Sequence, residues 1–172
     1  TAAEYAVLIR TLLEMNNFRC EEITDAVMSS VVPSVTNTVK EAIKKLFKVD
    51  VMVAGPGVKT GLNILIDNPK QLGSDQAVDA VAAINTYPVP LIIIDMGTAT
   101  KMMIVDKKGT FIGVSIIPGV NIALSALASG TAQLPQISLE APKSVIGKNT
   151  VDCMRSGVVF GNASMIDGMI DR

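Results

Sequence analysis

The spacing of apolar residues switches several times between helical and strand-like periods, which predicts an α/β chain. Residues 3–15 carry one apolar helical face at i, i+3, i+4 and i+7, made by Tyr5, Leu8, Ile9 and Leu12. Thr1 is placed to cap this helix, and Glu4 would complete a capping box. The apolar run 26–32 then predicts a buried strand that Pro33 ends.

A second helix and a second strand follow this run. Ser34 or Thr36 is placed to cap the helix, whose apolar face is made by Val39, Ala42, Ile43 and Leu46. The short run 51–53 favours a strand. Strand, helix and strand in this order predict a parallel crossover.

Two segments with candidate chemistry come next. Residues 55–61 hold three glycines and Lys59, and they either lie along an anionic ligand or simply connect two elements. A short strand at 62–66 is followed by a helix for which Ser74 is the expected N-cap. Asp75 then lies in the first helical turn, either as a charge that stabilises the helix or as a carboxylate base beside a cleft.

The connector 87–90 contains two prolines and marks the expected domain boundary. Beyond it, three apolar runs predict strands at 91–95, 101–106 and 110–117. These strands would form a meander that leads into a helix after residues 118–119. Gly109 suits a left-handed turn position between two of these strands. In the last helix, Gly157 and Gly161 allow another backbone to approach closely, either inside the fold or at a subunit contact.

A polar turn between two of these strands has the composition of a phosphate or metal site. Asp95 can hold a cation or its hydration shell, and Gly97 lets the backbone approach a ligand. Thr98 and Thr100 offer hydroxyls, while successive backbone N–H groups can form an anion-binding concavity. The alternative is an ordinary hairpin with a polar tip.

Composition mainly excludes functions. The 172 residues, 49% of them hydrophobic, allow one domain or two small ones around a sizeable core. A net charge of −1 and the absence of Trp argue against a nucleic-acid partner, and no apolar run is long enough for a membrane span. Without His, acid–base chemistry must come from Asp, Glu, Lys or Tyr. Cys20 and Cys153 are typical of reduced thiols in a cytoplasmic protein.

Seven short stretches occur in a fixed order: Gly55-Pro-Gly-Val-Lys-Thr-Gly-Leu-Asn63, Asp67-Asn-Pro69, Gly73-Ser-Asp75, Asp95-Met-Gly-Thr-Ala-Thr100, Pro118-Gly119, Thr131-Ala-Gln-Leu-Pro135 and Ile146-Gly-Lys-Asn-Thr150. In order and spacing this set resembles the type III pantothenate kinases, over essentially all 172 residues. Each stretch alone is a weak signal, whereas the ordered set is specific.

The resemblance implies a fold, an activity and partners. The fold would be two ribonuclease-H-like domains of the sugar kinase/actin/heat-shock-chaperone superfamily, incomplete here, with residues 1–88 in the first domain and 89–172 in the second. The activity would be ATP-dependent phosphorylation of pantothenate, the first step of coenzyme A biosynthesis. The family resemblance also implies a cytoplasmic homodimer that uses Mg²⁺ or another divalent metal and a monovalent cation, K⁺ or NH₄⁺.

Site residues follow from the same resemblance. The segment Gly73, Ser74, Asp75 and Gln76 matches the pantothenate-binding segment, and Asp75 in it corresponds to the proton acceptor. Asp95 matches the monovalent-cation ligand, and Thr98, with Gly97 beside it, matches an ATP-phosphate contact. Thr150 matches a pantothenate contact made across the dimer. A phosphoryl transfer of this kind needs positioning and charge neutralisation more than covalent help.

Three positions depart from the family pattern. Gln76 replaces an Arg and cannot supply its cation, and Ile66 replaces a frequent Tyr. The second phosphate loop carries Met96 and Lys101 where the family usually has Phe and Thr, and Lys101 is a candidate to replace some of the lost positive charge. These changes put ordinary affinity for pantothenate in question.

Both ends of the chain read as cut within helices, so a fragment is expected. The family's first phosphate loop, Asp-x-Gly-Asn-Thr, would precede Thr1, and its glycine-rich adenosine segment would follow Arg172. The chain as written is therefore predicted not to bind ATP productively, and micromolar ATP affinity would contradict this. Two alternatives stay open: a non-catalytic homologue that acts as an accessory factor, and a superfamily kinase for another small hydroxyl substrate.

Overall fold

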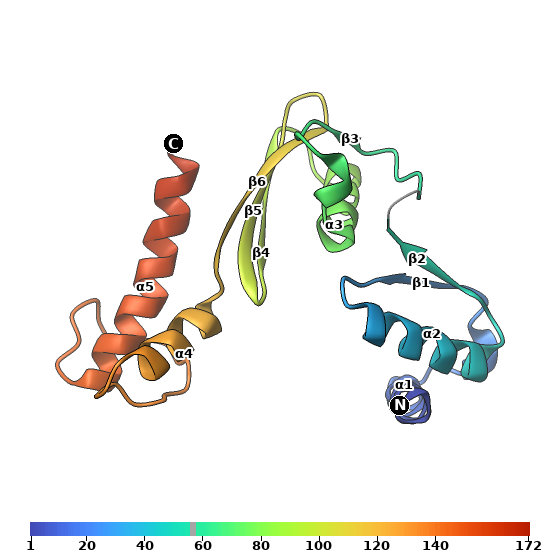
Figure 1. Cartoon of the computed structure of the whole chain (residues 1–172), viewed down its shortest axis with the longest axis horizontal. Helices are drawn as coiled ribbons and strands as arrows, with labels where there is room; N and C mark the ends of the chain where they lie inside the picture. The colour runs from blue at the N-terminus through green and yellow to red at the C-terminus, as the bar shows by residue number, and fades with distance from the viewer. Residues whose placement is uncertain (56–57) are drawn as a thin grey trace. The chain divides into compact units, whose positions relative to one another are not determined.

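The computed structural model describes residues 1–55 and 58–172, which contain both helices and strands (Figure 1). Residues 56 and 57 of the predicted glycine loop lie outside the described residues. Two short 3₁₀ turns, η1 (Cys20–Glu22) and η2 (Pro69–Gln71), accompany the main elements. These elements are α1 (Ala2–Met15), β1 (Ala26–Ser29), α2 (Pro33–Phe47), β2 (Val51–Ala54), β3 (Asn63–Ile64), α3 (Ser74–Thr86), β4 (Leu91–Met96), β5 (Ala99–Val105), β6 (Thr110–Pro118), α4 (Val120–Gly130) and α5 (Thr150–Ile170).

The first part of the chain is the predicted parallel crossover. β1 pairs in parallel with β2 over all four residues of each strand, and α2 connects them. Ala42, on the predicted apolar face of α2, is completely buried. α1 packs beside α2 (Figure 1), and its capping box is present, with the Glu4 N–H donating to Thr1 Oγ1 at 3.3 Å.

The boundary between β1 and α2 differs from the prediction. β1 ends at Ser29, and Pro33 begins α2 rather than ending a strand. Proline suits the first helical turn, because an N–H there would have no partner within the helix. Val32 takes the N-cap position without a side-chain cap. The Thr36 hydroxyl instead donates to the Val32 carbonyl oxygen at 3.0 Å, so the predicted cap by Ser34 or Thr36 is wrong.

The remaining strands form one sheet in the order β3-β6-β5-β4. β4, β5 and β6 are neighbours in chain order, which confirms the predicted meander, and β3 pairs in parallel with β6. The largest fully buried side chains all come from β5 and β6: Phe111, Met103, Val105 and Thr100. Buried side chains thus anchor β5 along its length, which fixes the turn at its start.

The turn between β5 and β6 holds a carboxylate in a network of backbone donors. Asp106 Oδ1 accepts hydrogen bonds from the Thr110 N–H at 2.9 Å and the Lys108 N–H at 2.8 Å. The bond from Thr110, more than that from Lys108, lowers the pKa of the Asp106 carboxyl below its ordinary value. Gly109 closes the turn with a φ of +76°, in the left-handed region as predicted.

Contacts divide the chain into two compact units, Thr1–Leu91 with Val105–Ile112 and Ile92–Ile104 with Gly113–Arg172. In the first unit α3 contacts β1, and in the second α4 contacts α5. The core of the second unit is made by Leu124, Met154 and Val158, with Val120, Leu134 and Ile137 packed against it. The mixed α/β class is confirmed. The boundary between residues 88 and 89 and the ribonuclease-H-like character of the domains stay predictions.

The two glycines of α5 face open space in the described chain. A Cβ added at Gly157 or Gly161 would meet no atom of the described residues within 4 Å. Tight packing within this chain, one of the two predicted reasons for these glycines, is therefore not observed there. The other reason, a subunit contact, stays a prediction. Among the described residues, no helix combines the length and the apolar character that crossing a membrane requires.

Candidate active site

The turn between β4 and β5 is short and exposed. β4 ends at Met96 and β5 begins at Ala99, so Gly97 and Thr98 connect the two strands. The Gly97 N–H donates to the Ala99 carbonyl oxygen at 3.1 Å. Both connecting residues are exposed, which leaves the Thr98 hydroxyl and the nearby backbone accessible to a ligand.

The second hydroxyl of this stretch is not accessible. Thr100 is only 1% exposed, and its Oγ1 has no hydrogen-bond partner among the described residues. Of the two hydroxyls that the sequence predicts for a ligand, only that of Thr98 lies at the surface. Thr98 lies in the exposed turn before β5, whereas Thr100 lies within the strand among its buried side chains.

Gly119 brings the start of α4 onto the turn. Its N–H donates to the Thr98 carbonyl oxygen at 3.2 Å. A Cβ at Gly119 would overlap the backbone carbonyl oxygens of Gly97 and Thr98, so only glycine permits this approach. The first N–H groups of α4 therefore lie beside the exposed turn, and a helix N-terminus with free backbone donors favours an anion.

Asp95 is ion-paired within the same unit. Lys101 Nζ lies 2.8 Å from Asp95 Oδ2, with the two side chains 16% and 30% exposed respectively. Lys101 stands in β5, between the buried Thr100 and Met102, so the strand holds its stem in place. The carboxylate expected to bind a cation thus already has a positive partner from the chain.

The start of α3 is built differently from the prediction. Gly73 takes the N-cap position and Ser74 is the first helical residue, so the predicted cap by Ser74 is wrong. Gln76 caps the helix instead, because its Oε1 accepts the Gly73 N–H at 3.3 Å. Ser74 Oγ donates to the Ser30 carbonyl oxygen at 3.4 Å and accepts from Ser29 Oγ at 3.3 Å, which ties α3 to the end of β1.

Gly73 also makes room for the candidate catalytic carboxylate. A Cβ at Gly73 would overlap Asp75 Oδ1, so any other residue there would displace the carboxylate. Asp75 is partly exposed in the first turn of α3, whereas Gln76 is 8% exposed. The amide of Gln76 is therefore committed to its own helix, and Asp75 is the member of this segment that offers an acid–base group.

A cavity of about 390 Å³ adjoins this segment within the first unit. It is mostly apolar, with a few polar groups, and lies between β2, β3, η2 and α3. Ser74 and Thr60 contribute hydroxyls and Lys70 an ammonium group. An apolar pocket with a few convergent polar groups is typical of a small-molecule site. Gly55 and Thr60, from the predicted glycine loop, also line this cavity.

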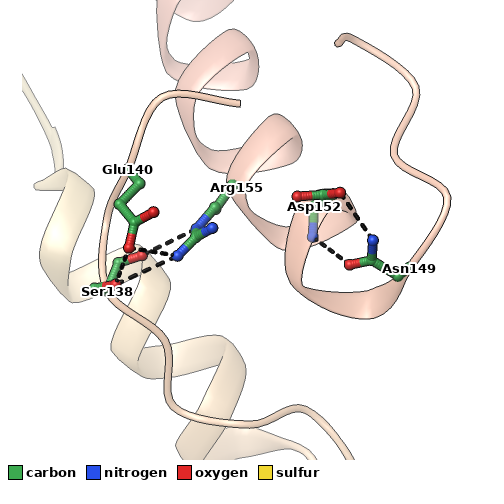
Figure 2. A network of polar contacts seen from close by, with 5 residues as sticks. All are labelled: Ser138, Glu140, Asn149, Asp152 and Arg155. Atoms are coloured by element: carbon green, nitrogen blue, oxygen red, sulfur yellow. Dashed lines mark hydrogen bonds and ion pairs between the residues drawn. The ribbon is translucent and has the colours of Figure 1, made fainter. Parts of the chain in front are cut away.

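Thr150 is the first residue of α5 and is exposed. Asn149 caps the helix, as Figure 2 shows: its Oδ1 accepts the Asp152 N–H at 3.0 Å, and its Nδ2 donates to Asp152 Oδ2 at 2.8 Å. Gly147 approaches the α5 backbone at Cys153 so closely that no Cβ would fit. These contacts fix the backbone on which Thr150 is presented.

A second network holds the loop before α5 onto the helix. Arg155 Nη2 lies 2.7 Å from Glu140 Oε1, and Arg155 Nε donates to the Ser138 carbonyl oxygen at 3.3 Å (Figure 2). The Ser156 hydroxyl donates to the Val145 carbonyl oxygen further along the same loop. Sequence patterns gave no signal for these contacts, since they join residues whose separation varies with loop geometry.

The predicted site residues thus form local groups. Gly73, Ser74, Asp75 and Gln76 lie together in the first unit. Asp95, Gly97 and Thr98 lie together in the second unit, where Thr150 stands apart at the start of α5. Within the described residues, no three His, Cys, Asp or Glu side chains come together as a metal cage.

The model of the family described as type III pantothenate kinase matches the chain over residues 1–172. The chain belongs to the type III pantothenate kinase family. A type III pantothenate kinase from Halalkalibacterium halodurans is 42% identical over 172 residues, which are all of this chain and 68% of that protein.

A solved structure is similar in fold. The protein, from Campylobacter jejuni and assigned to the Baf family of transcriptional activators, superimposes with a TM-score of 0.55 at 19% identity. The match covers 87% of this chain and 66% of that one. The chain therefore spans about two thirds of the length of these relatives.

Two of the departures from the pantothenate kinase pattern, at positions 76 and 101, have clear local contacts in the structure. Gln76, where the resemblance led us to expect an Arg, caps α3, and Lys101 places a cation beside Asp95. The pairing of Lys101 with Asp95 was missed at the sequence level. Opposite charges on the two sides of a short turn were the available signal.

Proposed function

We propose that the protein phosphorylates pantothenate with ATP to give 4′-phosphopantothenate, the first step of coenzyme A biosynthesis. The match of the family model to all 172 residues carries this proposal, and the 42% identity to a named relative supports it. The proposal concerns the full-length protein, since the chain spans about two thirds of its relatives. A cytoplasmic homodimer is the form we propose for it.

The turn of Gly97 and Thr98 fits the phosphates of ATP. Hydrogen-bond donors for phosphate oxygens are available from its exposed backbone, from the Thr98 hydroxyl and from the start of α4. Mg²⁺ in such sites keeps several waters and binds through one or two carboxylates together with phosphate oxygens, so a cage of protein ligands is not required. A bound divalent metal would neutralise charge on the transferred phosphoryl group.

The segment from Gly73 to Gln76 is the proposed pantothenate site. Ser74 lines the adjoining cavity, whose apolar walls and few polar groups suit a small organic acid with hydroxyls. Thr150 is proposed to add a contact from the partner subunit. Gln76 would shape the site through α3, because its amide is bonded to the helix start.

Asp75 is the proposed proton acceptor. Its carboxylate would orient the primary hydroxyl of pantothenate toward the γ-phosphorus. As the new oxygen–phosphorus bond forms and the bond to the β-phosphate oxygen breaks, ADP leaves and the hydroxyl proton passes to Asp75. Because the transition state is loose, this proton moves late, and positioning contributes more than basicity.

The test is a pantothenate-dependent ADP-release assay on the full-length protein. Asp75→Asn should lower kcat by about 10²- to 10⁴-fold while the thermal melt still shows a folded protein. Asp25→Asn, which alters an exposed carboxylate in the same unit, is the matched control and should leave kcat unchanged. A wild-type protein without pantothenate-dependent ADP release would contradict the proposed function.

Gln76 motivates the second candidate, a non-catalytic homologue, because an Arg at this position would supply a cation that the amide lacks. Gln76→Arg should raise the rate if the site is only weakened and leave no activity if it has lapsed. A panel of small hydroxyl compounds, scored for ADP release, separates both cases from a kinase with another substrate.

A further inference from the structure

The cation beside Asp95 comes from the chain itself. Lys101 Nζ is 2.8 Å from Asp95 Oδ2, the distance of a charge-assisted hydrogen bond. Only 16% of the Lys101 side chain and 30% of the Asp95 side chain are exposed. Salt therefore screens this pair less than it would a fully exposed one.

The strand that carries Lys101 makes this arrangement a fixed one. Thr100, Met102 and Met103 are buried on either side of it, so β5 cannot shift without breaking the core. A lysine ammonium is a compact point charge with three N–H donors, and as a compact cation with N–H donors it resembles NH₄⁺. A bare potassium ion at Asp95 fits this arrangement poorly, because the carboxylate already has its positive partner.

We propose that the Lys101 ammonium group replaces the monovalent cation at Asp95, so that the enzyme works without added potassium. The expected effect of Lys101 on rate rests on the proposed kinase function. Its expected effect on ion binding rests only on the pairing of Lys101 with Asp95.

The experiment compares full-length wild type with Lys101→Thr, in KCl and in choline chloride at equal ionic strength near 0.1 M. Wild type should have rates within about 2-fold of each other in the two salts. Lys101→Thr should lose about 10-fold or more in choline and recover with K⁺ or NH₄⁺. Lys107→Thr, which removes an exposed charge from the turn between β5 and β6, is the control and should behave as wild type.

Melting temperature supplies a readout that does not depend on catalysis. An ion that binds the folded state raises the melting temperature, so K⁺ should stabilise Lys101→Thr by about 2 °C or more and leave wild type unchanged. The proposal is overturned if K⁺ stabilises wild type as much as the variant, or if it stabilises neither. If no protein shows kinase activity, the proposed function fails, and the melting temperatures still decide whether Lys101 occupies the cation site.

Discussion

Gly119 lets α4 approach the proposed phosphate turn, and Gly119→Ala should push the two apart. The added methyl group would overlap two backbone carbonyl oxygens, of Gly97 and Thr98, which cannot rotate aside as a side chain can. Overpacking, together with loss of the 3.2 Å bond from the Gly119 N–H to the Thr98 carbonyl oxygen, should cost roughly 2–4 kcal/mol. At about 2–4 °C per kcal/mol for a chain of this size, the melting temperature should fall by about 4–16 °C.

The assay is a thermal melt of full-length protein followed by measurement of KM for ATP. Because the displaced turn is the proposed phosphate contact, KM for ATP should rise more than KM for pantothenate. Gly113→Ala is the matched control, since a Cβ at Gly113 in β6 meets nothing within 4 Å. That control should change stability by less than about 1 kcal/mol, in the stabilising direction. If Gly119→Ala keeps both the melting temperature and KM of wild type, the close approach of α4 to the turn is refuted.

Two further predictions concern carboxylates. Gly73→Ala should displace the Asp75 carboxylate and lower kcat by about 10-fold or more, with little change in melting temperature because the displaced side chain is flexible. Gly130→Ala, where a Cβ has open space, is the comparison. An unchanged kcat in Gly73→Ala would contradict the role of Gly73. For Asp106, the lowered pKa means that the ionised carboxylate stabilises the fold above its ordinary pKa of 3.8, and that this contribution is lost as pH falls through the lowered value. The gap in melting temperature between wild type and Asp106→Asn should therefore be constant above about pH 5.5 and narrow in more acidic buffer, whereas a gap independent of pH would count against the turn network.

Elements with strong periodicity were predictable from the sequence. The helical face containing Ala42, the meander of β4 to β6 and the left-handed Gly109 all follow local rules of spacing and turn chemistry, and the structure confirms them. Errors fell at element ends. Pro33 is compatible with either the end of a strand or the first turn of a helix. The exposed Val31 and Val32 extended the apolar run without belonging to the strand.

The start of α3 shows a second reason for such errors. Ser74 has the stronger intrinsic preference for the N-cap. Its hydroxyl instead bonds to Ser29 and Ser30, which are more than 40 residues away in sequence, and Gln76 satisfies the helix start. A tertiary partner thus overrides a local preference, and no pattern within the helix reveals that partner.

The two charge departures from the family pattern are independent in their local contacts. Lys101 was expected to replace positive charge lost where Gln76 stands. Each side chain instead has a partner in its own unit: Gln76 bonds to the Gly73 N–H, and Lys101 pairs with Asp95. Because the Asp95 carboxylate compensates the ammonium charge, the pair presents little net charge to a substrate. On the proposed roles, Lys101 would act on the cation requirement of the phosphate turn, while Gln76 would act on the substrate segment.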